Sequence, residues 1–405
     1  MLVPTAPIHY TLELTPKCNN RCIGCGDVFP DQPVSYLSAI QWQEVLKQLS
    51  PHVAHLRLTG GEPTLHPEFE GIIEAIGGLG ISFVLLTNAR WQDPDGLIGF
   101  LHNIPQCKGL VISLHGATPS SHEAFTQVVG SFAETVNNIR RAVAAGLMVS
   151  TSTVITKANC SQINDIIAFS AELGAERAVF ARYLPVRSDG ITPTCDQLRE
   201  VVSTVEAQRR CDAQVEFSLC IPQCFAPSSS VGCLSGVTYC VVDPWGNVRP
   251  CTHASLACGS LLEQSIEEIW HGLEMQRWRE MIPAQCHDCL EFPKCHGGCR
   301  AAAMMYGLEK DPLIGEPILE RAQELHEGLM LYGGAYPIPH FEIRSESFGY
   351  LLVRGNVAVP VARQAKLVLD ALDGRSTLRQ IGERFGQEAL NFVGELYKKG
   401  IVEMK

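Results

Sequence analysis

The feature that most constrains this chain is a triplet of cysteines, Cys18, Cys22 and Cys25, separated by three and by two residues. The triplet directly follows a run from Ile8 to Leu14 in which apolar and polar residues alternate, a pattern typical of a β-strand. Three thiolates on one short loop can bind three irons of a cubane cluster and leave the fourth iron without a protein ligand. We therefore expect a reactive iron-sulfur cluster directly after the first strand.

A zinc site is the alternative interpretation of the same triplet. Structural zinc is held by four ligands in a tetrahedron, often three cysteines and a histidine. The histidine nearest to the triplet in the sequence is His9, on the predicted strand. The spacing therefore favours iron-sulfur chemistry and leaves zinc as the alternative.

The composition predicts a globular protein of the cytoplasm. At 405 residues and 46% hydrophobic, the chain is long enough for two or three domains with cores of their own. Its N-terminus does not read as a signal peptide, and no apolar run approaches the length of a membrane span. The 17 cysteines then predict metal or redox chemistry and not a disulfide framework. The net charge of -11 disfavours nucleic acid or an anionic membrane as partners.

The first half of the chain alternates predicted strands and helices. The predicted strands are short apolar segments rich in branched residues: His9–Leu14, His55–Thr59, Phe83–Thr87, Leu110–Leu114, Met148–Ile155 and Ala178–Tyr183. The predicted helices are marked by an N-cap at Ser38 for Ala39–Leu49 and by apolar stripes at Phe69, Ile72, Ile73 and Ile76 and at Phe132, Val136, Ile139 and Val143. This α/β order predicts a partial, TIM-like (β/α)6 barrel, with an open doubly wound sheet as second choice. In both folds chemistry belongs at the C-terminal strand ends, where the cysteine triplet lies.

A glycine pair follows the second predicted strand, in the segment Gly60-Gly61-Glu62-Pro63. Because glycine has no Cβ, such a pair lets backbone groups approach a ligand closely. Together with the cysteine triplet, this segment resembles the radical S-adenosylmethionine (radical SAM) enzymes. The resemblance implies SAM contacts at the strand ends, from Gly60, Gly61, Glu62, Asn88, Ser113 and Asn159.

What the resemblance implies for the reaction is specific. Cys18, Cys22 and Cys25 would hold a [4Fe-4S] cluster whose open iron is chelated by the methionyl group of SAM. An electron from the cluster then cleaves the sulfonium, and the resulting 5'-deoxyadenosyl radical abstracts a substrate hydrogen. Two positions depart from the family pattern: Ala89 replaces a glycine after Asn88, and Gly24 replaces an aromatic residue that contacts adenine. Adenine packing must then come from elsewhere, with Phe29 as one source.

The next region, from about Cys220 to Cys299, is rich in cysteine, glycine and proline. Residues 241–248 are expected to form a hairpin with a Trp-Gly-Asn turn. A run of four cysteines with spacings of two, five and three residues follows: Cys286, Cys289, Cys295 and Cys299. Such a run predicts a metal site but does not by itself distinguish zinc from iron-sulfur.

In context, this region resembles the SPASM extension of radical SAM peptide-modifying enzymes, which carries two auxiliary clusters. By resemblance, one set of ligands is Cys233, Cys240, Cys251 and Cys299, and the other contains Cys286, Cys289 and Cys295. The last ligand of the second set is usually a cysteine, but Ile314 stands in its place. Cys220, Cys224, Cys258 and Asp311 are possible substitutes. Thr252 replaces an aspartate base of sulfatase-maturing relatives, which disfavours that role and leaves His253 as a guess for a base.

The C-terminal part reads as a small separate domain. A helical stretch at 317–331 and a linker through Pro337-Ile338-Pro339 are expected to precede strands at 341–344 and 350–353. Three apolar stripes then predict short helices, the first starting near Val361, and Ile401–Met404 is expected to close the domain as a strand. Strands followed by three helices suggest a winged helix. Residues 336–405 hold 10 Lys+Arg against 8 Asp+Glu, a balance that is weak for phosphate binding.

This C-terminal part resembles the PqqD-like domains that recognise the leader of a precursor peptide, through residues 348–350, 371–374 and 396–402. Such a domain would add the leader as an extra strand. We therefore expect a radical SAM barrel at 1–215, a SPASM domain with a connecting helix at 216–335, and a PqqD-like domain at 336–405. The seven cysteines left unassigned are Cys107, Cys160, Cys195, Cys211, Cys220, Cys224 and Cys258.

The expected function is modification of a ribosomally made precursor peptide, by a thioether or carbon-carbon crosslink or by epimerisation. Its cofactors would be SAM, the radical SAM cluster and one or two auxiliary clusters, and a flavodoxin or ferredoxin would donate electrons. Two alternatives remain open. One is a heme-pathway enzyme that modifies tetrapyrroles, because residues 295–303 also resemble members of that pathway. The other is a non-catalytic iron-sulfur or zinc protein whose winged helix binds DNA as a redox sensor.

Overall fold

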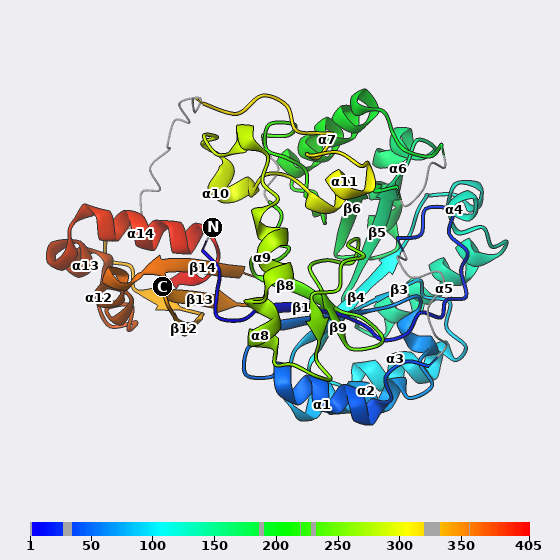
Figure 1. Ribbon diagram of the computed structural model, residues 1–405, viewed down its shortest axis with the longest axis horizontal. Coiled ribbons are helices and arrows are strands. Elements are labelled where there is room, and N and C mark those ends of the chain that lie inside the picture. The colour runs from blue at the N-terminus through cyan, green and yellow to red at the C-terminus, as the bar shows by residue number, and fades with distance from the viewer. Residues whose placement is uncertain are drawn as a thin grey trace. The chain divides into compact units, whose positions relative to one another are not determined.

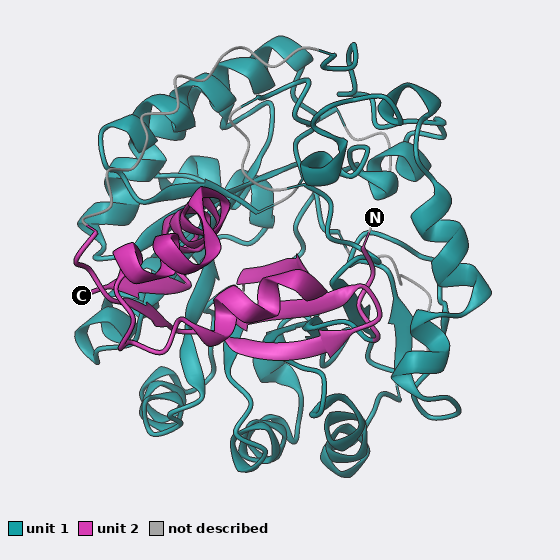
Figure 2. Ribbon diagram, turned by 90° about the vertical axis from the view of Figure 1, so that its left-hand side faces the viewer, with its two compact units in different colours: residues 1, 6–319 teal, residues 2–5, 320–405 magenta. Residues whose placement is uncertain are grey.

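The computed structural model describes residues 2–26, 35–185, 190–218, 220–227, 232–319, 333–355 and 357–405. The chain forms two compact units: residues 6–319 belong to the first, and residues 2–5 together with 320–405 belong to the second (Figure 2). All 17 cysteines lie between Cys18 and Cys299. The predicted cluster chemistry is therefore confined to the first unit.

One ten-stranded sheet forms the frame of the first unit (Figure 1). Its strands stand in the order β10-β9-β8-β1-β2-β3-β4-β5-β6-β7. Their bounds are β1 His9–Glu13, β2 His55–Thr59, β3 Phe83–Thr87, β4 Cys107–Ser113, β5 Val149–Ile155, β6 Arg177–Arg182, β7 Val215–Phe217, β8 Tyr239–Val242, β9 Asn247–Arg249 and β10 Gly259–Ser260. From β1 to β7 every neighbouring pair is parallel and the order never reverses. A doubly wound sheet would reverse its order, so the predicted barrel-type fold is confirmed.

Helices connect the strands, and α1, α2 and α3 lie along one outer side of the sheet (Figure 1). Their bounds are α1 Ala39–Leu49, α2 Phe69–Gly78, α3 Pro94–His102, α4 Pro119–Thr126, α5 Ser131–Ala144, α6 Ile163–Glu172 and α7 Cys195–Arg210. After the sheet come α8 Ile266–Trp270, α9 Leu273–Glu280, α10 Phe292–Cys295 and α11 Arg300–Met305. Among the residues that the structure describes, no helix is long and apolar enough to cross a membrane.

Local sequence signals explain where these elements begin. The side chain of Ser38 accepts a hydrogen bond from the backbone of Gln41, whose side chain bonds back to the cap, so α1 starts at the predicted residue. The apolar stripe of α2 is buried, from Phe69 to Ile76. β4 begins at Cys107, three residues before the prediction, because Cys107 already pairs with Phe83 of β3. Glycine is needed within this strand, since a Cβ on Gly109 would be 2.6 Å from Met148 O.

The cysteine-rich region continues the sheet of the barrel. β8 pairs in parallel with β1, with Cys240 opposite Tyr10. The predicted hairpin is confirmed, because β8 and β9 pair antiparallel across a turn in which Gly246 has a φ of +86°. The boundary expected at residue 215 falls inside β7, where the chain is still part of this sheet.

The described residues of the second unit form a three-stranded antiparallel sheet, a two-stranded sheet and three helices. Their bounds are β11 Pro337–Pro339, β12 Glu342–Glu346, β13 Gly349–Arg354, β14 Val357–Ala362, α12 Lys366–Asp370, α13 Leu378–Phe385, α14 Gln387–Lys398 and β15 Val402–Met404. The core is aliphatic, with Leu352, Leu372, Ile381, Val393 and Ile401 all buried. The strands and the three helices agree with the predicted order of elements.

Two predictions in this unit were wrong, and most of a third, the helix at 317–331, lies outside the described residues. The expected linker at Pro337–Pro339 is a strand that pairs with β15. Proline is tolerated there because the ladder donors are the flanking Tyr336, which bonds to Lys405 O at 2.8 Å, and His340, which bonds to Ile401 O at 2.9 Å. Val361, expected to open a helix, belongs to β14.

Candidate functional site

The predicted SAM-binding positions all lie at the C-terminal edge of the parallel strands. The cysteine loop follows β1, Gly60 to Glu62 follow β2, Asn88 follows β3, Ser113 ends β4, and Asn159 follows β5. In parallel α/β sheets this edge is where ligands bind, because the connecting loops meet there. The fold therefore gathers on one side positions that are far apart in the sequence.

The backbone of the cysteine loop is attached to the end of α4. Arg21 N donates to Thr126 O at 3.1 Å, and Ile23 N donates to Phe125 O at 2.9 Å. These two bonds flank Cys22 on both sides. Helix α4 therefore determines the path of the loop between its cysteines.

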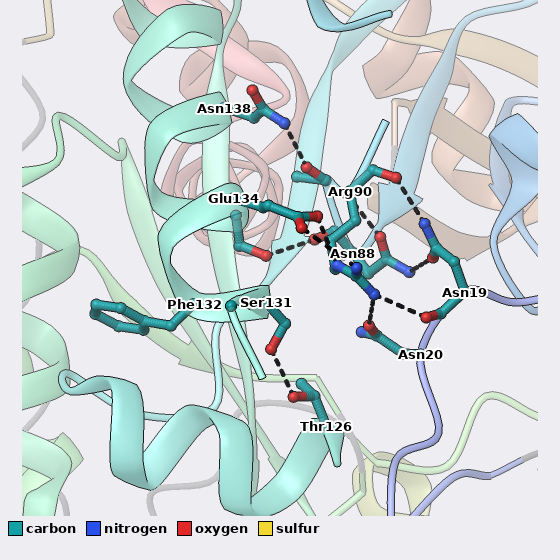
Figure 3. A network of polar contacts seen from close by, with 12 residues as sticks. Asn19, Asn20, Asn88, Arg90, Thr126, Ser131, Phe132, Glu134 and Asn138 are labelled. Atoms are coloured by element: carbon teal, nitrogen blue, oxygen red, sulfur yellow. Dashed lines mark hydrogen bonds and ion pairs between the residues drawn. The ribbon is translucent and has the colours of Figure 1, made fainter. Parts of the chain in front are cut away.

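Arg90, just after β3, binds the two asparagines among the three residues between Cys18 and Cys22 (Figure 3). Its guanidinium donates to Asn19 O at 2.7 Å and to Asn20 Oδ1 at 2.9 Å. Its Nε pairs with Glu134 of α5 at 2.8 Å. Sequence reasoning missed Arg90 as a residue that positions the loop; the available signal was the pair of asparagines within the cysteine triplet.

Asn88 links the same loop to β3 and α5 (Figure 3). Its Nδ2 donates to Asn19 Oδ1 at 2.7 Å and lies 3.7 Å from Cys18 Sγ. Its own carbonyl accepts a hydrogen bond from Thr135 Oγ1 at 2.9 Å. The next residue, Ala89, has a φ of +58°, the left-handed region that favours the glycine of the family turn. The turn therefore keeps a glycine-type backbone although its residue is alanine.

The glycine pair after β2 packs on the chain itself. A Cβ on Gly60 would lie 2.5 Å from Thr15 O, and a Cβ on Gly61 would lie 2.3 Å from Lys17 O. Gly61 N donates to Thr15 O and Glu62 N to Lys17 O, both at 2.7 Å. The close approach that we expected toward a ligand is thus made to the backbone that leads into the cysteine loop.

Glu62 is a buried carboxylate that joins two turns. Its Oε1 accepts hydrogen bonds from Thr64 Oγ1 and Thr87 Oγ1, each at 2.8 Å. Its Oε2 accepts from Asn88 N at 2.8 Å. Burial raises the pKa of Glu62, while these hydrogen bonds oppose the rise. The role that these contacts show for Glu62 is to position the loops after β2 and β3.

Asn159 likewise makes contacts within the chain. Its Nδ2 donates to His115 O at 3.0 Å and to Val154 O at 2.9 Å, and its Oδ1 accepts from Thr156 N at 2.8 Å. Asn159 therefore joins the end of β5 to the segment that follows the half-buried Ser113. Burial lowers the pKa of His115 to about 3, so its imidazole is neutral at neutral pH.

Gly24 is surrounded by large side chains. A Cβ on Gly24 would lie 2.9 Å from ring atoms of both Phe125 and Tyr183 and 3.0 Å from Ile191 Cδ1. Two aromatic rings from elsewhere in the barrel therefore border the position where the family carries its aromatic residue. Phe29, the source of adenine packing suggested by the sequence, lies outside the described residues.

The chemistry of the triplet fits an iron-sulfur cluster. Burial raises the pKa of Cys22 to about 12, and repulsion from the Cys25 and Cys18 thiolates adds to the rise. Positively charged irons would offset that repulsion and stabilise the thiolates. No three cysteine, histidine or acidic side chains of the described chain are placed to hold one metal ion together. Zinc would need that convergence, whereas each thiolate of a cubane binds a different iron.

Three of the four predicted ligands of the first auxiliary set lie together. Burial and the neighbouring Cys299 and Cys233 thiols raise the pKa of Cys251 to about 12. Cys240, the fourth predicted ligand, is fully buried in β8, and burial followed by the neighbouring Cys258 thiol raises its pKa. Cys258 is therefore a neighbour of Cys240 inside the sheet.

The predicted cysteines of the second auxiliary set line one pocket. Its lining includes Cys286, Cys289 and Cys295 together with Cys224. Ile314, which stands where the family has a cysteine, lines the same pocket and is buried. The pocket thus holds the three expected thiols and a fourth that the sequence motif does not include.

Asp311 was considered as a substitute for the missing ligand of the second auxiliary cluster, but its carboxylate already binds other residues. Its carboxylate forms a buried ion pair with Arg182. It also accepts hydrogen bonds from Cys299 N at 2.9 Å and from Leu313 N at 3.0 Å. These contacts give Asp311 a structural role next to Cys299.

His253 lies beside the end of the cysteine loop. A Cβ on Gly26 would lie 3.3 Å from His253 Nε2, and His253 Nδ1 is 3.1 Å from Thr252 Oγ1. Burial, with the charges of Arg182 and Arg249, lowers the pKa of His253 to about 4. The imidazole is therefore neutral but weakly basic, which does not favour it as a general base.

Comparison with known proteins decides the family. Residues 12–169 match the radical SAM superfamily, and residues 233–290 match the iron-sulfur cluster-binding domain called SPASM. The chain contains a radical SAM domain and a SPASM domain. Its cofactors are therefore a [4Fe-4S] cluster, SAM and the auxiliary iron-sulfur clusters of the SPASM domain, and the non-catalytic redox sensor considered from the sequence is excluded.

Similar proteins are found among both curated sequences and solved structures. This chain is 28% identical over 331 residues to the mycofactocin maturase MftC of Mycobacterium ulcerans. The matched region covers 76% of this chain and 86% of the relative. It is 27% identical over 341 residues to the AdoMet-dependent heme synthase of Methanosarcina barkeri, over 77% and 96% of the two chains. SuiB of Streptococcus suis bound to its precursor peptide SuiA superposes with a TM-score of 0.64 at 17% identity, over 76% and 75% of the two chains. The last comparison supports the fold.

Proposed function

We propose that this radical SAM enzyme modifies a ribosomally synthesised precursor peptide, by forming a thioether or carbon-carbon crosslink or by epimerising a residue. The relatives support the proposal, because they include a maturase and a precursor-peptide complex of the same fold. When bound at Cys18, Cys22 and Cys25, the cluster would supply the electron that cleaves SAM. An external donor of flavodoxin or ferredoxin type would supply that electron.

The described residues would contribute by holding the SAM-binding edge rigid. Arg90 and Asn88 fix the loop between the first two cysteines, and Glu62 joins the turns that follow β2 and β3. Phe125 and Tyr183, which border Gly24, would provide the apolar surface for adenine in place of the family aromatic residue. Each of these contacts reduces the motion of loops that must present SAM in one orientation.

A sheet in the second unit supports the proposal of a peptide substrate, because an extended peptide can bind along its edge. The three-stranded sheet has the order β12-β13-β14, so both outer strands have one partner strand within the described residues. An extended leader could add to such an edge through backbone hydrogen bonds. β14 carries no charged residue before Arg363, and its half-buried Val357 and Val359 pack against the core of the unit, whereas β12 carries Glu342 and Arg344. We therefore assign leader binding to the edge of β14.

The test uses the anaerobically reconstituted full chain and the peptide translated from a short reading frame beside the gene. The enzyme should form 5'-deoxyadenosine from SAM and shift the mass of the peptide. Replacing Cys18, Cys22 or Cys25 by alanine should abolish SAM cleavage, because the open iron is lost. Replacing Cys286 or Cys289 should spare part of the cleavage while product formation falls.

Leader binding is tested by fluorescence anisotropy with the same labelled peptide. Ala358→Asp on β14, a residue that is not part of the core, should weaken binding about tenfold or more, whereas the matched variant Ile343→Asp on β12 should not. Weakening by Ile343→Asp alone would move the site to β12. Equal affinity of both variants and the wild type would contradict leader binding by this sheet.

A heme-pathway reaction is the second candidate, and the heme synthase relative is the observation that favours it. The two candidates differ in substrate. Conversion of an iron porphyrin precursor with 5'-deoxyadenosine formation, and no change in any peptide, would establish the alternative. The second unit has no evident task in that reaction.

A further inference from the structure

We propose that one short segment, Cys220 to Cys224, supplies a thiolate to each of the two auxiliary clusters. Cys224 completes the set of Cys286, Cys289 and Cys295, and Cys220 completes the set of Cys233, Cys251 and Cys299. The inference rests on the cluster-binding role of these cysteines and is independent of which substrate the enzyme modifies. It gives both sets four thiolates, although the sequence motif lacks the last ligand of the second set.

Cys224 shares a pocket with the three cysteines of the second set. The pocket is also lined by Phe292, Gly297 and Gly298, so its wall is largely free of charge. Gly315 N donates a hydrogen bond to Cys224 Sγ at 3.4 Å. Backbone hydrogen bonds of this kind are typical of cluster thiolates, whose charge and potential they tune.

Ile314 explains why a thiolate must come from a different segment. A Cβ on Gly298 would lie 2.8 Å from Ile314 Cδ1, so the isoleucine packs tightly against the glycine turn that follows Cys295. An aliphatic side chain cannot ligate iron. The neighbouring residue, Gly315, instead directs its N–H to Cys224.

Cys220 lies with the first set. It is buried, and the charged groups that act on its thiol are, in order of strength, Cys233, Cys299, Arg182 and finally Cys295 of the second set. Arg182 Nε is buried and has no hydrogen-bond partner among the described residues. Because that N–H is left over after the guanidinium has paired with Asp311, it can donate to a thiolate or sulfide of a cluster at this place.

The two thiols are held on a rigid segment. Ile221, directly after Cys220, is buried in the aliphatic core with Phe180 and Phe217. Pro222 O accepts hydrogen bonds from Phe225 N at 2.9 Å and from Ala226 N at 3.0 Å, which forms a turn around Cys224. The segment thus enters the core next to one set and turns beside the other.

Cys240 and Asp311 are the competing ligands. Cys240 is fully buried within β8, where it pairs with Tyr10 of β1, and the charged groups that act on its thiol are Cys258 and Arg279. Asp311 already accepts hydrogen bonds from Arg182, Cys299 and Leu313. The positions of Cys240 and Asp311 are therefore explained by contacts within the protein, without a bond to iron.

The test is the iron and sulfide content of the anaerobically reconstituted full chain, with EPR and Mössbauer spectra of the clusters. Three cubanes hold about twelve irons. Cys224→Ala and Cys220→Ala should each lower the iron content by about one to four atoms and should produce three-iron or missing clusters. The matched controls, Cys240→Ala and Cys258→Ala, should retain the full iron content. Full iron in both Cys220→Ala and Cys224→Ala, or iron lost only in Cys240→Ala, would overturn the proposal.

Two measurements guard against simple misfolding. The cluster at Cys18 to Cys25 should still cleave SAM in every variant, so 5'-deoxyadenosine formation reports an intact barrel even if no peptide is modified. In addition, Ile314→Cys restores the usual family ligand in the same pocket. The double variant with Cys224→Ala and Ile314→Cys should recover the iron that Cys224→Ala loses. Failure of that rescue, with SAM cleavage intact, would count against Cys224 as a ligand.

Discussion

Asp311 and Arg182 form a buried, bidentate ion pair. Arg182 Nη1 lies 3.1 Å from Asp311 Oδ1, and Arg182 Nη2 lies 2.8 Å from Asp311 Oδ2. Their side chains are 0% and 4% exposed. Arg182 ends β6 of the barrel, and Asp311 also accepts the backbone N–H of Cys299 at 2.9 Å. The pair therefore connects the last strand of the barrel directly to a cysteine of the auxiliary region.

We predict that Asp311→Ala destabilises the protein by about 3–5 kcal/mol, because it leaves the charge of Arg182 buried without a partner. The double variant with Arg182→Met should recover most of that loss. The measurement is the midpoint of urea unfolding under anaerobic conditions. The control is the half-exposed ion pair between Arg177 of β6 and Glu216 of β7. Breaking this pair should cost at most about 1 kcal/mol. A similar loss for both pairs would show that burial of the Asp311 pair is not what matters.

Arg90→Ala should impair SAM cleavage about ten- to hundredfold while most of the iron is retained. The reason is that Asn19 and Asn20 would lose the donors that fix the cysteine loop. The rate of 5'-deoxyadenosine formation and the iron content are the measurements. Arg141→Ala is the control, because Arg141 makes only an exposed pair with Asp95. Equal rates for the two variants would contradict a positioning role for Arg90.

Gly24→Phe, which restores the usual family residue, should weaken SAM binding and lower the thermal midpoint. The new side chain would have to displace the rings of Phe125 and Tyr183, which lie 2.9 Å from its Cβ position. Overpacking of this kind costs about 1–3 kcal/mol or more. Gly99→Ala on α3 is the control, since a Cβ there meets nothing within 4 Å. Unchanged SAM affinity in Gly24→Phe would contradict this prediction, because it would mean that the rings of Phe125 and Tyr183 can move aside without affecting the SAM site.

The protein should lose stability as the pH falls from about 6.5 toward 4. Burial lowers the pKa of His122 to about 4, compared with about 6.5 in the unfolded chain. Between these values the unfolded state binds more protons, so each such histidine reduces the free energy of unfolding by at most about 1.4 kcal/mol per pH unit. Full stability is reached above pH 6.5.

The variant that tests this pH dependence is His122→Asn. Its amide oxygen can still accept the hydrogen bond that His115 N donates to Nδ1 at 3.2 Å. The variant should show a shallower fall in the urea midpoint between about pH 6.5 and 4.5. Replacing the exposed His102 should leave the slope as in the wild type. An unchanged slope in His122→Asn would assign the acid sensitivity to other groups.

Much of the fold could be predicted because the local signals agree with the tertiary structure. The buried stripe of α2 and the cap of α1 depend on residues three or four positions apart, which lie close together in any helix. β11 was misjudged because proline reads as a break, and only its pairing with β15 shows that the missing N–H groups are not needed. The start of β4 was missed for a similar reason, since glycine reads as a break and the close contact of Gly109 is with Met148, just before β5.

The candidate site shows the same division. The place where a cluster can form follows from the sequence alone, because Cys18, Cys22 and Cys25 lie on one loop and their spacing is a local property. The distant residues that position this loop, such as Arg90, and the thiols near the two auxiliary sets become apparent in the folded chain. A ligand set assembled from separate segments depends on packing and burial, which place Cys224 in the pocket and Cys240 inside a strand. Spacing along the chain carries no information about those distances.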